Sequence, residues 1–79
     1  MYPAIVQVKP LDDYHVVLSF ANGEVRRFDM KPYLETGLFV QLKERELFDS
    51  VKVSFDTIEW NNQLDFDPEI LYEKSTPVE

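Results

Sequence analysis

Residues 60–73 read Trp-Asn-Asn-Gln-Leu-Asp-Phe-Asp-Pro-Glu-Ile-Leu-Tyr-Glu, and they can be interpreted position by position. Trp60 ends an apolar run that is typical of a strand, and Asn61-Asn62-Gln63 has the composition of a turn. Asp67 is a candidate helix N-cap, because its carboxylate can accept a hydrogen bond from a free N–H of the first turn. Pro68 suits the first helical position, which needs no N–H. These residues predict a strand end, a polar turn and a short closing helix.

Upstream, Asn22-Gly23 lies between two apolar runs and is the strongest local turn signal. This dipeptide favours a two-residue type I′ hairpin turn, whose central positions both need positive φ. The predicted strands are residues 14–20, with apolar residues at every second position, and residues 25–29. A two-residue turn would place Phe20 opposite Val25.

The other predicted elements are a first strand over residues 5–9, short irregular helices over residues 30–36 and 38–51, and a second hairpin with strands over residues 51–55 and 58–60. In the second hairpin, Val51, Val53 and Phe55 alternate with polar residues, which predicts one apolar face. The expected fold class is α+β: an antiparallel β-meander plus a second β-hairpin, with short helices and a C-terminal capping helix. We expect a single domain over residues 1–74 and a flexible tail over residues 75–79.

Composition narrows the possible functions. The chain has 79 residues, a net charge of −7 and no cysteine, which excludes a disulfide framework, a thiolate metal site and a cysteine nucleophile. The acidic balance argues against direct contact with nucleic acid, because phosphate neutralisation drives most of that binding. There is neither a signal-peptide pattern nor an apolar run of about 20 residues, so we expect a cytoplasmic protein without a membrane span.

Several pieces of the chain together carry a family pattern: residues 20–26, 28–30, 37–42, 46–51, 58–62, 65–69 and 71–73. In this order and spacing the chain resembles the small bacterial family called domain of unknown function 2442. The resemblance runs from about Ile5 to Glu73. Two positions depart from the family pattern, which usually has glycine where Gln63 stands and an apolar residue where Arg27 stands.

The resemblance implies an α+β fold and no established catalytic activity. Family members are often encoded beside another small protein, in pairs that look like toxin–antitoxin modules. In such a pair this chain is similar to the acidic, protective partner. The resemblance therefore implies a non-enzymatic protein–protein interaction module whose protein partner is encoded by a neighbouring gene.

Few side chains are candidates for catalysis or metal binding, and each of them has a structural explanation. His15 is the only histidine and has no predicted nucleophile beside it, so we expect a surface or partly buried strand histidine. Asp65, Asp67 and Glu69 alternate as in some cation sites, but Ile70 stands where a calcium-binding loop needs glycine. We expect no catalytic residue, no metal site and no cofactor. A metal-dependent hydrolase remains a third hypothesis.

The predicted partner contact consists of exposed apolar residues ringed by acids, which would attract a basic protein. Asp65 is also expected to hold the turn at residues 61–63 through backbone hydrogen bonds. The candidate structural or partner-contact residues are Phe39, Phe48, Trp60, Asp65, Asp67 and Tyr72. The alternative hypothesis is a homodimeric structural or regulatory domain that pairs through its sheet.

Overall fold

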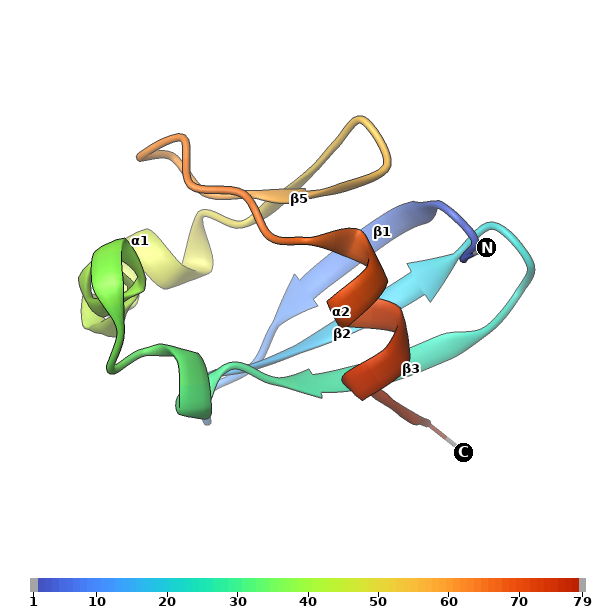
Figure 1. Cartoon of the computed structure of the whole chain (residues 1–79), viewed down its shortest axis with the longest axis horizontal. Coiled ribbons are helices and arrows are strands. Elements are labelled where there is room, and N and C mark those ends of the chain that lie inside the picture. Colours follow the sequence, from blue (N-terminus) through green and yellow to red (C-terminus); the bar gives the residue numbers. More distant parts are fainter. Residues whose placement is uncertain (1, 79) are drawn as a thin grey trace.

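A four-stranded antiparallel sheet is the base of the computed structural model, which describes residues 2–78 (Figure 1). Strands β1 (Ile5–Pro10), β2 (His15–Phe20) and β3 (Val25–Asp29) form a meander. The two-residue strand β6 (Thr76–Pro77) pairs with β3 and completes the order β1-β2-β3-β6.

A separate hairpin and four short helices complete the fold. The hairpin pairs β4 (Lys52–Ser54) with β5 (Thr57–Glu59) and packs against β1. The helices are η1 (Lys31–Tyr33), η2 (Gly37–Lys43), α1 (Arg45–Asp49) and α2 (Pro68–Lys74). Figure 1 shows α2 lying against the sheet, with the β4–β5 hairpin at the top of the view and α1 at the left. The predicted α+β class with an antiparallel meander and a second hairpin is confirmed.

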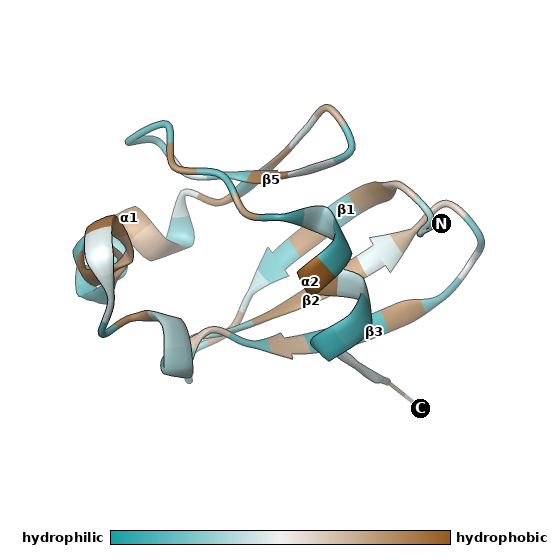
Figure 2. Ribbon diagram, viewed as in Figure 1, coloured by the Kyte–Doolittle hydropathy of each residue, from teal (hydrophilic) through white to brown (hydrophobic). Residues whose placement is uncertain are grey.

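The core lies between one face of the sheet and the elements that cover it. Residues of β2 alternate as predicted, with Val16, Leu18 and Phe20 buried, because successive side chains of a strand point to opposite faces. Figure 2 shows hydrophobic segments along the meander and on α2. The buried hydrophobic residues are Ile5, Val16, Leu18, Phe20, Phe28, Met30, Leu34, Leu42, Phe48, Val51, Ile58, Trp60, Phe66 and Leu71.

The hairpin between β2 and β3 has a three-residue loop, so the predicted two-residue turn is wrong. The Phe20 N–H donates to the carbonyl oxygen of Glu24, and only Gly23 has positive φ, at 92°. Asn22 keeps negative φ and uses its side-chain oxygen to accept from the Glu24 N–H at 3.0 Å. A three-residue loop of this kind needs one left-handed residue rather than two.

This loop shifts the pairing by one residue relative to the prediction. Ser19, rather than Phe20, lies opposite Val25. Because a shift of one residue moves every side chain of a strand to the other face, Arg26 lies on the core face and Arg27 on the outer face.

Two further sequence predictions need correction. Phe55 lies at the tip of the second hairpin, outside the strand, because β4 ends at Ser54. Its side chain is therefore exposed and is not part of an apolar strand face. Residues 75–78 continue the domain beyond the predicted boundary, because Ser75 is buried and Thr76–Pro77 pairs with β3. Glu79 lies outside the described residues.

The loop after β5 has the same hydrogen bonds as the loop after β2. The Gln63 N–H donates to the carbonyl oxygen of Trp60, and the Trp60 N–H donates to that of Leu64, both at 2.9 Å. Gln63 occupies the left-handed position, with φ of 69°. This position favours glycine, because a Cβ in the left-handed region lies too close to the backbone.

Replacing this residue with glycine should therefore stabilise the protein. We expect Gln63→Gly to raise the free energy of unfolding by about 0.5–1 kcal/mol. The relieved strain stabilises the folded state, and the greater entropy of the unfolded chain with glycine offsets part of that gain. Urea denaturation monitored by Trp60 fluorescence measures the change. Gln63→Ala is the control, since it removes the same side chain and keeps the strain. Equal stabilities of the two variants would contradict the assignment of strain to this position.

Candidate functional site

The structure buries two of the four aromatic candidate residues. Phe48 and Trp60 have exposed fractions of 0%, and the Trp60 indole N–H donates to the carbonyl oxygen of Phe48 at 3.1 Å. The prediction that they are exposed is wrong, because the apolar side of α1 and the end of β5 both turn towards the sheet. These two residues hold the core together and cannot contact a partner while the domain is folded.

Phe39 is half-buried, in η2. Its ring packs against the ring of Phe66, with 5.3 Å between centroids. The neighbouring Leu38 and Val40 are exposed instead. The aromatic residue at this point of the chain therefore anchors η2 to the core, and its aliphatic neighbours face solvent.

Asp67 caps α2 as predicted, since its Oδ1 accepts from the Glu69 N–H at 2.9 Å. Asp65 was predicted to hold the turn at residues 61–63 through backbone hydrogen bonds, but a different residue does so. Asn62 holds the loop, because its Oδ1 accepts from the Leu64 N–H at 3.2 Å. Asp65 contributes an isolated backbone bridge to Glu59. Both acids thus serve local structure.

Tyr72 belongs to a polar cluster that joins α2 to the sheet. Its hydroxyl donates to Glu24 at 2.5 Å, and its ring packs edge-on against Phe20. The Arg26 guanidinium lies 4.9 Å from the Tyr72 ring centroid and donates to the Glu24 carboxylate at 2.8 Å. It also donates to the hydroxyl and the carbonyl oxygen of Ser75. We call Glu24, Arg26, Tyr72 and Ser75 the Arg26 clamp.

The clamp changes the acid–base properties of two of its members. The hydrogen bond from Tyr72 lowers the pKa of Glu24, and the bonds from Asn22 and Arg26 act in the same direction. The same hydrogen bond raises the pKa of Tyr72, because only the neutral phenol can donate it. These shifts follow from structural contacts and do not by themselves indicate catalysis.

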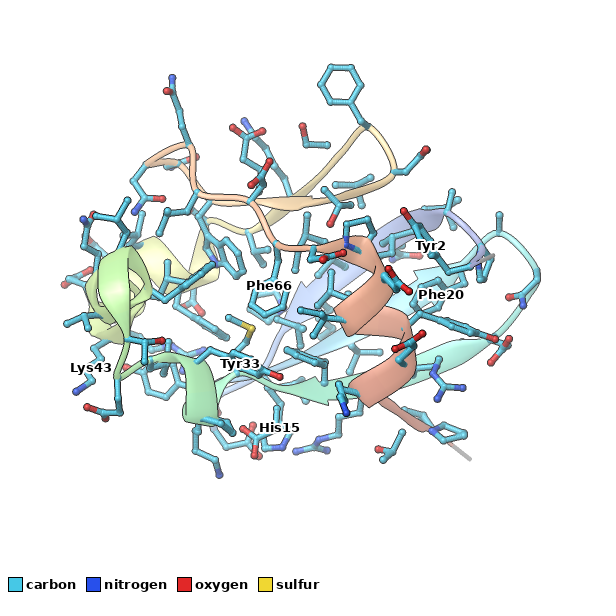
Figure 3. All side chains as sticks on the ribbon, in the orientation of Figure 1. Tyr2, His15, Phe20, Tyr33, Lys43 and Phe66 are labelled. Carbon is cyan, nitrogen blue, oxygen red and sulfur yellow. The ribbon has the colours of Figure 1, made fainter. Side chains whose placement is uncertain are left out.

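His15 lies on the outer face of the sheet, as a partly buried strand histidine. Figure 3 shows it pointing away from Phe20 and Phe66, which lie on the core side. Its Nδ1 is 3.0 Å from Asp13, which also accepts from Arg27 at 2.7 Å. Arg26 and Arg27 are on opposite faces, so they do not form one basic site.

Acidic and basic residues are unevenly distributed along the chain, which the net charge alone does not show. Residues 1–52 carry eight acidic and seven basic side chains, whereas residues 53–79 carry seven acidic and one basic. Every ion pair between described residues joins side chains of residues 13–49. The described acids of the second part, with no ion pair within residues 2–78, are Asp56, Glu59, Asp65, Asp67, Glu69 and Glu73.

These acids lie in the turn before β5, on β5, on the loop after it and on α2, which Figure 1 shows in amber to red. Phe55 immediately precedes the first of them and is 97% exposed. We call residues 55–73 the acidic hairpin–helix segment. Sequence reasoning missed Phe55 because the alternation from Val51 extends one residue past the strand. The turn lies at residues 55–56, one residue before the gap at residues 56–57 between the two predicted strands.

Within residues 2–78 the structure holds no pocket and no group of three or more histidine or acidic side chains placed to bind a metal ion. No described helix has the length and apolar character that crossing a bilayer requires.

Comparison with known families gives one result. The family model described as Protein of unknown function (DUF2442) matches residues 5–77. The chain belongs to this family. Comparisons with curated proteins and with solved structures gave no match. The resemblance inferred from the sequence is thereby confirmed, and the family description assigns no activity.

The Arg26 clamp gives a prediction with a matched control on the adjacent residue. We expect Arg26→Lys to lower the free energy of unfolding by about 1–3 kcal/mol, because lysine cannot reproduce the fork that reaches Glu24 and Ser75 together. Arg27→Lys, on the outer face, should change stability by less than about 0.5 kcal/mol. Urea denaturation of both variants measures the contrast. Equal losses would show that the guanidinium is not essential to the clamp.

The lowered pKa of Glu24 predicts a pH effect. Its stabilising contribution is present above the unfolded-state pKa near 4.5 and is lost as the pH falls through the lower folded-state pKa. Between about pH 6 and pH 3, the Tm of the wild type should therefore fall further than that of Glu24→Gln. Thermal scans by circular dichroism measure both slopes. Glu73→Gln, which removes an equal charge outside the clamp, is the control, and a Glu24→Gln slope equal to that of the wild type would contradict the prediction.

Proposed function

We propose that this chain is a cytoplasmic, non-enzymatic protein-interaction module whose acidic hairpin–helix segment binds a basic protein. The observation that supports it best is the separation of charge. Acids and bases nearly balance over residues 1–52, while the acids at positions 56–73 have no ion pair within residues 2–78.

Unpaired surface carboxylates of one sign act over a distance. Their fields add, and they attract a protein of opposite charge before contact is made. Such steering raises the association rate more than the final affinity, and it weakens as salt is added. Glu69 and Glu73 lie one helical turn apart on α2 and repel each other weakly. A basic partner would relieve that repulsion.

The family resemblance supports a more specific role. In that role the partner is the product of a neighbouring gene, and this chain is the acidic, protective member of a toxin–antitoxin-like pair. Binding would then act by covering the partner, so this chain would need no catalytic group.

A homodimer through the outer face of the sheet is the second candidate. Val25 and Val78 are exposed neighbours there, since the Val78 N–H donates to the carbonyl oxygen of Val25. Three strands of five or six residues and the two-residue β6 present roughly 300 Å² at the usual strand spacing. A stable complex buries about 800 Å² per partner, so we rank this candidate below the heterologous complex.

The first test measures the mass of the purified chain, alone and mixed with the product of its neighbouring gene. Size-exclusion chromatography with light scattering should show a complex only in the mixture. A dimer of the chain alone that persists in high salt would favour the second candidate.

A second measurement tests the role of charge. Glu69→Lys combined with Glu73→Lys should lower the association rate with that gene product by about tenfold or more at low salt. Asp12→Lys combined with Glu46→Lys makes the same charge change outside the segment and should lower the rate much less. Stopped-flow or surface plasmon resonance gives both rates. Equal reductions would show that total charge, rather than the segment, attracts the partner.

A further inference from the structure

Phe55 has the most exposed large apolar side chain among the described residues. Its exposed fraction is 97%, against 63% for Leu38 and 59% for Val6. The aromatic contacts of the core involve other rings, and Phe55 makes none of those found within residues 2–78. The side chain therefore contributes no packing to the folded domain.

Its backbone is also unfavourable. Phe55 has φ of 55°, in the left-handed region that bulky residues rarely adopt. Tyr14 has a similar φ of 62°, but its ring packs on Phe48 at 4.9 Å and its hydroxyl donates to the carbonyl oxygen of Lys43. No comparable contact within residues 2–78 offsets the strain at Phe55. A glycine would satisfy the fold better at this position, so the phenylalanine needs another explanation.

The hairpin tip that carries Phe55 is held in place. The Ile5 N–H donates to the carbonyl oxygen of Asp56 at 3.3 Å, which ties the tip to β1. The hairpin is paired up to Ser54 and Thr57, and Ile58 behind it is buried. A partner that binds an aromatic ring presented in this way loses little conformational entropy. Large aromatic side chains are also enriched among the residues that dominate binding energy.

The surroundings of Phe55 indicate the kind of partner. Asp56 follows it directly, and the unpaired acids of the hairpin–helix segment continue from there. The complementary surface is an apolar pocket bordered by lysine and arginine.

We propose that Phe55 is the anchor of the interaction, and that it inserts into an apolar pocket rimmed by basic residues on a partner protein. The proposal rests on the proposed function and specifies its central contact. It also explains why this position holds a residue that is strained and exposed.

Site-specific photo-crosslinking tests this contact and identifies the partner in the same experiment. The full chain, with p-benzoyl-phenylalanine at position 55, is expressed in its native host and irradiated, and the same is done at position 38. We expect one discrete crosslink, to a basic protein, from position 55 and a much weaker one from position 38. A crosslink to a second copy of the chain, or equal crosslinks from both positions, would overturn the proposal.

Binding by purified proteins then separates anchoring from folding. Phe55→Gly should raise Tm by a few degrees, because it relieves the left-handed strain. The same variant should weaken binding to the crosslinked protein by about 30-fold or more. Leu38→Ala shortens another exposed apolar side chain, outside the acidic hairpin–helix segment, and should leave the affinity within about twofold, as measured by isothermal titration calorimetry.

The outcomes distinguish the two proposals. If a basic protein co-purifies with the wild type and binds Phe55→Gly equally well, the anchor is wrong and the interaction module stands. If nothing crosslinks at either position and nothing co-purifies, both are wrong.

Discussion

The fold depends on the Arg26 guanidinium being satisfied on the core side of the sheet. A charged group under α2 would be costly without partners, and here it donates to the carboxylate of Glu24 and to Ser75. Glu24 immediately precedes β3, and Ser75 immediately follows α2 and leads directly into β6. One side chain therefore fixes how the closing helix sits and where the last strand pairs. Tyr72 completes the arrangement by covering the guanidinium with its ring.

The parts of this fold that could be predicted from sequence are those that depend on neighbouring residues. The cap of α2 needs only Asp67 and Pro68, and the burial of alternate β2 residues needs only the period of a strand. The register of β2 and β3 could not be obtained in this way, because Asn-Gly serves both two-residue and three-residue loops. The difference is one residue, yet it decides that Arg26 rather than Arg27 faces the core.

The candidate site was harder to predict for a related reason. Phe48 and Trp60 were expected at the surface, because short irregular helices and strand ends do not indicate which side faces inward. The total charge of −7 indicated an acidic surface but not its position. Only the ion pairs show that half of the eight acids of the first part pair with an arginine or a lysine, while those from Asp56 onward have no such partners within residues 2–78. The distribution of the acidic residues along the chain, rather than their number, indicates the segment proposed to attract a partner.

Strained residues are informative in a chain this small. A domain of this size has a stability of roughly 4–12 kcal/mol, so a strained residue costing about 1 kcal/mol is a noticeable fraction of it. Tyr14 offsets its strain through contacts with Phe48 and Lys43, which are part of the fold. Phe55 is strained and 97% exposed, and the contacts that fix its hairpin come from the backbone of Asp56 and the paired strands. The tip is thus held rigid while its side chain is left free, as expected for a group that completes its contacts in a second molecule.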